Sequence, residues 1–262
     1  MKNKILLSLT TASILAVWTG FVEASFTIAH TGSTDPIAEG FGLWANLGSS
    51  TVEPVRNDGG YEAWSITGLT PFQQYAYFSE PLNPSQQSDI ENQGFVLTVV
   101  ERVLQGIAPN YSPSNPAIIG VVAVSTGSQR FDIDLGIDSN GDTVVVLADN
   151  AYYSGNNVVT PGASFTLMGS GGSYHAYQLV YDPKTQLADL FVDGIERIQD
   201  YAGFSYPTNP LYSLYISGAN GGQANFSSVQ FTSSPIPLPG AVWLFAVGIV
   251  GLAGISTGRK KH

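Results

Sequence analysis

The sequence contains no cysteine and little charge. Charged residues make up 11% of its 262 residues, with 10 Lys and Arg against 20 Asp and Glu and a formal net charge of −10. Without thiols the chain forms neither disulfides nor thiolate metal sites. An acidic surface repels nucleic-acid phosphates and anionic lipid head groups. The composition therefore argues against a nucleic-acid partner and favours neutral partners such as glycans, or divalent cations.

A long apolar run lies near the C-terminus. The residues from Gly240 to Gly258 carry no charge, and as a helix they would span roughly 28 Å, close to the hydrocarbon thickness of a bilayer. Arg259, Lys260 and Lys261 follow directly and favour the cytoplasmic side of a membrane. We expect a transmembrane helix at 240–258 with a basic tip at 259–262. The alternative is a buried core helix, which fits poorly at the end of a small β domain.

The N-terminus has the pattern of a secretory signal. Lys2 and Lys4 precede the apolar stretch Ile5–Val17, and small residues surround a cleavage site between Ala24 and Ser25. The alternative is an uncleaved N-terminal anchor. We expect a signal peptide at 1–24, one domain at 25–232 and a C-terminal sorting segment at 233–262.

Alternating prolines at 235, 237 and 239 precede the C-terminal apolar run, so this segment is neither helix nor interior strand. Trp243-Leu244-Phe245, a glycine-rich span and the basic tip follow. This order resembles the PEP-CTERM protein-sorting signal, in the variant usually written Val-Pro-Leu-Pro-Ala. Isoleucine and glycine stand here for the valine and alanine, and there is no Pro-Glu-Pro. The sorting motif is Pro235, Ile236, Pro237, Leu238, Pro239 and Gly240.

The resemblance implies a Gram-negative bacterium with an exosortase-type membrane enzyme as the processing partner, and usually exopolysaccharide production. The precursor would be held in the inner membrane. Cleavage near the proline motif would then deliver the protein to the cell surface or the extracellular matrix.

Between its two ends the chain shows short apolar or alternating runs separated by Gly, Pro, Asn and Asp, which predicts an all-β sandwich or barrel. We expect surface loops at 83–92 and 108–116, where Pro, Ser, Asn and Gln gather. The expected strands are Gly94–Leu104, Ala117–Ser125, Arg130–Ile137, Thr143–Ala148, Ser164–Met168, Tyr174–Tyr181, Leu187–Val192, Leu211–Ser217 and Asn225–Phe231.

Asn140-Gly141 matches a two-residue hairpin turn that needs positive φ at both positions. That turn would place Ile137 opposite Val144 and Leu135 opposite Val146.

A second stretch carries a recurring pattern: Tyr174-His175, an alternating strand to Tyr181-Asp182, a turn at 182–185, and Leu190-Phe191-Val192-Asp193-Gly194. This pattern resembles the laminin-G-like and concanavalin A-like jelly rolls. With the strand count, it predicts a two-sheet antiparallel jelly-roll sandwich. Jelly rolls of this kind often bind calcium between loops, so the resemblance makes calcium the one candidate cofactor.

Oxygen ligands alternate along Asp138, Asn140 and Asp142, as at the start of a calcium-binding loop. A hairpin turn accounts for the same residues, and both interpretations remain open.

Catalytic motifs are not found. Related glucanases carry a Glu-x-Asp-x-x-Glu cluster on one strand, which the sequence does not contain. Asp132 and Asp134 share one face of a strand, and we expect that face to be a solvated face. The domain at 25–232 contains no Gly-x-Ser-x-Gly elbow, so His175 is expected to be structural. The sequence thus predicts a non-catalytic protein.

The loop from Asp149 to Val158 is the best candidate for glycan binding, because it combines aromatic rings with amides. Its proposed ligand-binding residues are Tyr152, Tyr153, Asn156 and Asn157. We therefore expect an exported surface or matrix protein that binds a glycan or another surface protein. The alternatives are a jelly-roll polysaccharide-degrading enzyme with an unrecognised site and a structural spacer without ligand.

Overall fold

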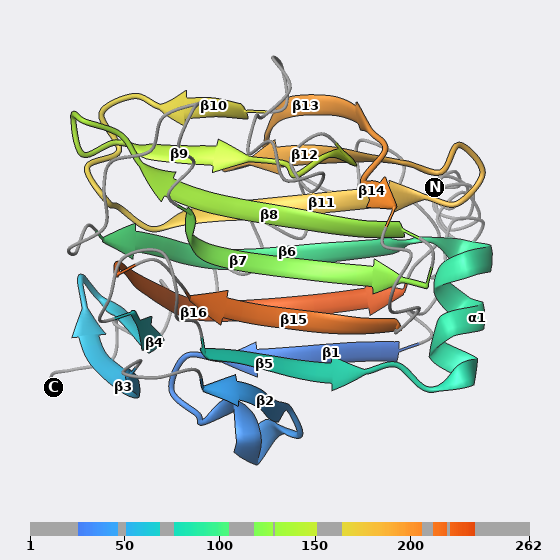
Figure 1. The fold of residues 1–262 in the computed structure, drawn as a ribbon, viewed down its shortest axis with the longest axis horizontal. Coiled ribbons are helices and arrows are strands. Elements are labelled where there is room, and N and C mark those ends of the chain that lie inside the picture. The colour runs from blue at the N-terminus through green and yellow to red at the C-terminus, as the bar shows by residue number, and fades with distance from the viewer. Residues whose placement is uncertain are drawn as a thin grey trace, which may run out of the picture.

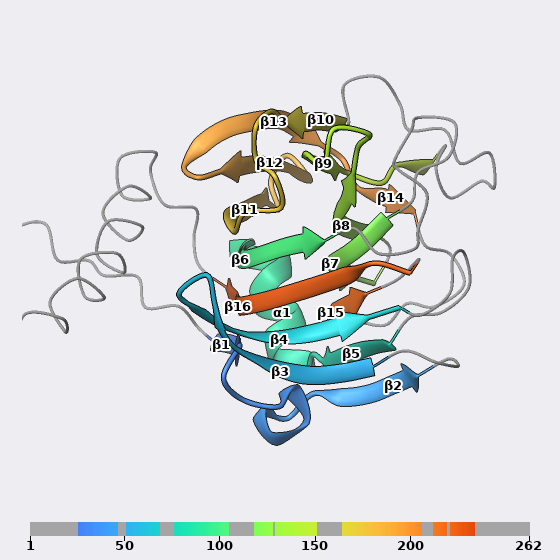
Figure 2. The same cartoon turned by 90° about the vertical axis from the view of Figure 1, so that its left-hand side faces the viewer.

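The computed structural model describes residues 26–46, 51–68, 76–104, 118–127, 129–150, 164–205, 212–218 and 221–233. Within them, most of the regular structure is β-strand, arranged as two antiparallel sheets that lie face to face (Figures 1 and 2). The prediction of a two-sheet antiparallel jelly-roll sandwich is confirmed.

Sheet A is eight-stranded. Its strands are β1 (Phe26–Thr31), β3 (Thr51–Asp58), β4 (Tyr61–Thr67), β6 (Phe95–Leu104), β11 (His175–Asp182), β12 (Leu187–Val192), β13 (Ile195–Tyr201) and β16 (Gln223–Ser233). Their order is β13-β12-β11-β6-β16-β4-β3, and β1 also pairs with β16.

Sheet B is also eight-stranded. Its strands are β2 (Gly42–Asn46), β5 (Ala76–Pro81), β7 (Ile118–Thr126), β8 (Gln129–Ile137), β9 (Thr143–Val146), β10 (Ser164–Leu167), β14 (Phe204–Ser205) and β15 (Tyr212–Gly218). Their order is β10-β9-β8-β7-β15-β5-β2, and β14 also pairs with β8.

The core lies between the sheets and is built on aromatic contacts. The Phe95 ring of sheet A lies 5.3 Å from Phe231 in the same sheet and 5.8 Å from Phe131 in sheet B. All three rings are fully buried, and each such side chain stabilises the fold by roughly 1.5–3 kcal/mol.

One end of the sandwich is covered by the helix α1 (Pro84–Gln93), seen at the right of Figure 1. The side chain of Asn83 accepts hydrogen bonds from the backbone N–H groups of Ser85 and Gln86, and the Gln86 side chain accepts one from Asn83 N–H. This capping box and Pro84 at the first position start the helix. A short 3-10 helix, η1 (Pro36–Glu39), follows β1.

The expectation of a loop at 83–92 is therefore wrong. Ile90 is the only buried residue of α1, so the helix has no apolar stripe from which its period could be read. The strands β1 to β5 were also not among the expected strands. β3 contains Pro54 and β4 has four consecutive buried residues, and neither feature gives a regular alternation.

The register expected for β8 and β9 is wrong by one residue. Ile137 pairs with Thr143 and Leu135 with Val145. Gly141 has a positive φ of 85°, whereas Asn140 is not among the residues with positive φ. The connection is therefore a longer loop, closed by Asp138 N–H donating to Asp142 O at 3.0 Å.

The hairpins of the jelly-roll pattern agree with the expectation. β11 leads through a turn into β12, and Asp193 and Gly194, both with positive φ, turn the chain into β13.

The signal peptide, the sorting motif and the transmembrane segment are predictions that lie outside the described residues, as do Tyr152, Tyr153, Asn156 and Asn157. In the part of the chain that is described, no helix has the length and apolarity to cross a membrane.

Candidate functional site

The predicted calcium ligands lie in the β8–β9 loop. Asp138 Oδ1 accepts hydrogen bonds from the N–H groups of Asn140, at 2.8 Å, and Asp142, at 3.0 Å. Asp142 Oδ1 accepts one from Gly171 N–H at 3.3 Å. These bonds close a turn. Across the described ranges, no three His, Cys, Asp or Glu residues are grouped to hold a metal ion. Calcium at this loop stays a prediction.

His175 begins β11, as expected. Its Nδ1 lies 2.6 Å from Asp193 Oδ2, and Asp193 Oδ1 accepts a hydrogen bond from Ala176 N–H at 2.9 Å. Asp193 thus connects the start of β11 to the β12–β13 turn, and this geometry supports a structural role for the histidine.

Asp132 and Asp134 are not a solvated face, and that expectation is wrong. Their relative exposures are 2% and 3%. Phe131, Ile133 and Leu135, the alternate residues of β8, belong to the core between the sheets. The two carboxylates therefore point away from sheet A, on the outer face of sheet B, and that face is covered.

Neighbouring strands add further polar groups to this face. The strand register places Asp132 beside Ala123 of β7 and then Tyr215 of β15. The next row runs from Arg130 through Ser125 to Ser213. We call this set the outer-face cluster: Arg130, Asp132, Asp134, Ser125, Ser213 and Tyr215.

Arg130 is held at the edge of the cluster. Its Nε lies 2.7 Å from Asp132 Oδ1. Its guanidinium carbon lies 5.2 Å from the centre of the Tyr215 ring and 5.8 Å from that of Phe204. An ion pair and two aromatic rings thus fix the guanidinium.

The two carboxyl groups differ in their electrostatic surroundings. Burial raises the pKa of Asp132, and the charge and hydrogen bond of Arg130 oppose that rise. Burial raises the pKa of Asp134 well above its usual value, and the Asp132 carboxylate raises it further. The cluster therefore holds one carboxylate paired with arginine beside a carboxyl group that keeps its proton more strongly.

The cluster includes three buried oxygen atoms. Among the described residues, none forms a hydrogen bond with Asp134 Oδ1, Ser125 Oγ or Ser213 Oγ. Burying such atoms unpaired costs free energy, and natural proteins satisfy most of them. A bound water molecule, or a ligand that carries several hydroxyl groups, would supply the missing partners and remove that cost.

Sequence reasoning placed Asp132 and Asp134 on one strand face but missed that this face is covered. The missed signal lies in the strands on either side. β9 reads Thr-Val-Val-Val and β7 begins Ile-Ile-Gly-Val-Val-Ala-Val, so both are apolar on both faces. Continuous apolar strands indicate a sheet region buried on both sides.

No family model and no curated protein matches the chain. Solved structures of similar fold include an endo-β-1,4-glucuronan lyase from the fungus Trichoderma reesei, at 12% identity and a TM-score of 0.47 over 80% of this chain and 96% of that one. Peanut lectin is 12% identical, with a TM-score of 0.48 over 82% of this chain and 100% of that one. A legume lectin-like domain from Entamoeba histolytica is 9% identical, with a TM-score of 0.45 over 78% and 95%. Likenesses at this level carry no argument about the site.

Proposed function

We propose that this chain is an exported bacterial surface or extracellular-matrix protein whose sandwich binds a polysaccharide without cleaving it. The observation that carries this proposal is the outer-face cluster. Its Arg130 and Tyr215 side chains are partly exposed, and on the same sheet face lie buried oxygens of Asp134, Ser125 and Ser213 for which no described residue supplies a hydrogen-bond partner. Sugars present both hydroxyl groups, which pair with such oxygens, and C–H faces, which stack on aromatic rings.

The charge of the cluster favours a neutral glycan. Arg130 Nε already pairs with Asp132 Oδ1 at 2.7 Å. The guanidinium charge is therefore largely neutralised and attracts an anionic sugar only weakly. The chain as a whole carries a formal net charge of −10, and this charge disfavours the approach of acidic polysaccharides.

The cellular localisation of the protein is part of the proposal. The sorting motif at 235–240 and the basic tip at 259–262 support an inner-membrane precursor that an exosortase-type enzyme processes. Intact mass spectrometry of the protein from its native host tests this. We expect a species that begins at Ser25 and ends near Pro237 to Gly240. A mature species that still carries Arg259 to His262 would contradict processing and leave a membrane-anchored protein.

A second candidate function is cleavage of a polysaccharide. The observation that favours it is the pair of buried carboxyl groups on one face of β8, with the pKa of Asp134 raised well above its usual value. Residues two apart on a strand lie about 6.5–7 Å apart, and inverting glycosidases hold their carboxyl groups roughly 6.5–9.5 Å apart. Asp134 would be the proton donor and Asp132 the base.

One experiment distinguishes these functions. The full-length protein is incubated with dextran, galactomannan and a β-1,3-glucan, with alginate as the acidic comparison, and both saturable binding and release of new chain ends are measured. We expect binding to a neutral polysaccharide without release. Release that Asp134→Asn abolishes would establish the enzyme instead. If the protein shows no binding and no release, the remaining function is that of a structural spacer.

A further inference from the structure

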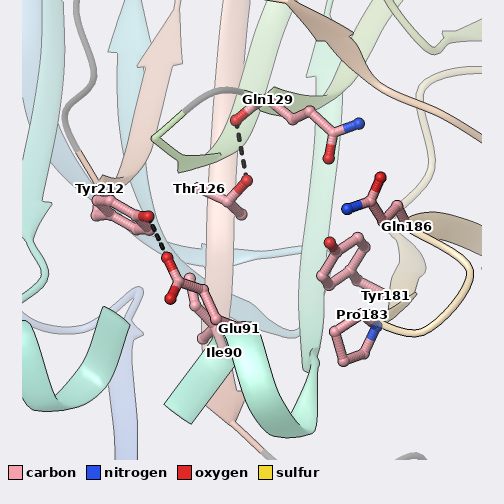
Figure 3. Close-up of a pocket in the computed structure, with 8 residues that line it drawn as sticks. All are labelled: Ile90, Glu91, Thr126, Gln129, Tyr181, Pro183, Gln186 and Tyr212. Atoms are coloured by element: carbon pink, nitrogen blue, oxygen red, sulfur yellow. Dashed lines mark hydrogen bonds between the residues drawn. The ribbon is translucent and has the colours of Figure 1, made fainter. Parts of the chain in front are cut away.

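A separate cavity opens at the end of the sandwich that α1 covers (Figure 3). It has a volume of about 260 Å³ and lies between α1, the β7–β8 turn, the β11–β12 turn and the start of β15. Pockets for drug-sized ligands start at about 300 Å³, so this cavity suits something smaller, such as a single sugar ring. We call it the α1 pocket.

Two glycines hold the walls of the α1 pocket in place. A Cβ on Gly127, whose φ is +83°, would lie 2.8 Å from the Tyr212 ring. A Cβ on Gly94, whose φ is +85°, would lie 2.3 Å from Tyr181 O and 2.9 Å from Pro183 Cδ. Both walls therefore pack closely against backbone positions that only glycine fits.

The apolar wall is rigid. The Tyr181 ring stacks on Phe95, with centroids 5.0 Å apart, and also packs 4.9 Å from Phe131 in the core. Tyr181 and Pro183 offer ring faces to the cavity. Flat, fixed apolar surfaces of this kind pair with the C–H face of a sugar at little entropic cost.

Gln186 occupies a backbone position that favours glycine. Its φ is +60°, and its N–H donates to Asp182 O at 2.8 Å to close the β11–β12 turn. Long side chains rarely adopt this left-handed conformation, and such outliers gather at ligand sites. The Gln186 amide lies near the Gln129 amide and the Tyr181 hydroxyl at one side of the cavity (Figure 3).

The opposite side of the cavity carries a charged residue, Glu91. Glu91 accepts a hydrogen bond from the Tyr212 hydroxyl. This bond, more than burial, raises the pKa of Tyr212 to about 12, so the hydroxyl keeps its proton. Among the described residues that line the pocket, Glu91 is the only charged one, and it disfavours anionic ligands.

We propose that the α1 pocket binds one ring of a neutral sugar, either free or at the end of a chain, with the ring against Tyr181 and Pro183 and its hydroxyls on Gln129 and Gln186. This site is distinct from the outer-face cluster and does not rest on the function proposed for it.

Saturation-transfer NMR with the full-length protein tests the proposal. The probes are D-glucose, D-galactose and D-mannose, with D-glucuronate as the acidic comparison, and the detergent is non-glycosidic so that it does not compete. We expect saturable binding of at least one neutral sugar and none of glucuronate. Gln186→Gly removes the amide and relieves the backbone, so the variant should fold at least as well while its Kd rises about threefold to tenfold for each hydrogen bond lost.

Asn57→Gly is the matched control, since Asn57 has a φ of +56° in the β3–β4 hairpin and lies outside the lining. It should bind as the native protein does. Glu91→Gln should keep neutral-sugar binding and admit glucuronate.

Absence of saturation with all three neutral sugars would overturn the proposal. Unchanged affinity in Gln186→Gly would do the same. The double variant Asp132→Asn/Asp134→Asn should leave monosaccharide binding intact. If it abolishes binding while Gln186→Gly does not, the sugar binds at the outer-face cluster and the α1 pocket is excluded.

Discussion

Strands β6 and β8 lie in opposite sheets, and each directs alternate side chains into the shared core. Along β6 the intervening side chains, such as Thr98 and Arg102, are partly exposed. Along β8 the intervening Asp132 and Asp134 are buried as well. The outer face of sheet A is thus open where that of sheet B is covered. Alternation identifies the side chains that face the core, but not whether something covers the opposite face.

The acidic groups on the two faces differ in the same way. Asp58, over the outer face of sheet A, accepts hydrogen bonds from Tyr174 and Asn225, both at 2.6 Å, and from Arg102. Asp134, on sheet B, has a buried oxygen for which no described residue supplies a partner. Both carboxylate oxygens of Asp58 thus accept hydrogen bonds, whereas Asp134 Oδ1 has no partner among the described residues.

The largest expected effect comes from breaking the ion pair on each face. Arg130→Met leaves Asp132 buried at 2% exposure without its counter-charge, so unfolding free energy should fall by about 3–5 kcal/mol. Arg102→Met should cost about 1 kcal/mol, because Asp58 keeps its other donors. Urea denaturation measures both. Equal losses would mean that the two faces are equally shielded from water.

A smaller effect should separate valines on the two outer faces. Val146 is fully buried beside Asp134, and Val146→Thr should cost about 1–3 kcal/mol because it buries a hydroxyl. Val180, partly exposed on β11 of sheet A, is the control, and Val180→Thr should change stability by no more than about 0.5 kcal/mol. A negligible loss in the Val146 variant would show that sheet B is open.

The smallest effect is a pH dependence. Burial, reinforced by Asp132, raises the pKa of Asp134, so the folded protein holds a proton that the unfolded chain releases above about pH 4. The contribution of Asp134 to the unfolding free energy is fully present at lower pH. It is lost as the pH rises, by about 1.4 kcal/mol per pH unit, until the pH reaches the pKa of Asp134 in the folded protein. Asp134→Asn should flatten the curve, and Glu196→Gln, on an exposed position of β13, should not. Parallel curves for native protein and Asp134→Asn would contradict a buried carboxyl.

The fold was predictable where turn chemistry and strand pattern agree. Asp193-Gly194 sits after a strand that ends in Leu190-Phe191-Val192, and the structure turns there as expected. The helix α1 was not predictable from periodicity, because Ile90 is its one buried residue. The β8–β9 register depended on whether Asn140 adopts positive φ, and here the Asp138 side chain forms a longer loop instead.

The sequence predicted only part of the candidate site. Spacing placed Asp132 and Asp134 on one face, but the sign of their burial lies in the continuous apolar runs of β7 and β9 and not in β8 itself. Tyr215 and Ser125 join them only because β15 and β7 are sheet neighbours, although these strands lie about 90 residues apart in the sequence. The α1 pocket is built from similarly distant segments.

The most direct test of the central claim, that the outer-face cluster is the polysaccharide site, is a binding titration of the full-length protein with the neutral polysaccharides named above. Native protein is compared with Asp132→Asn/Asp134→Asn, which keeps the shape of the face, and with the exposed control Glu196→Gln. We predict that the double variant weakens binding about tenfold, since each hydrogen bond that is lost contributes about 0.5–1.5 kcal/mol, and that the control binds as the native protein does. Equal affinities in all three proteins would contradict the account and place the glycan elsewhere.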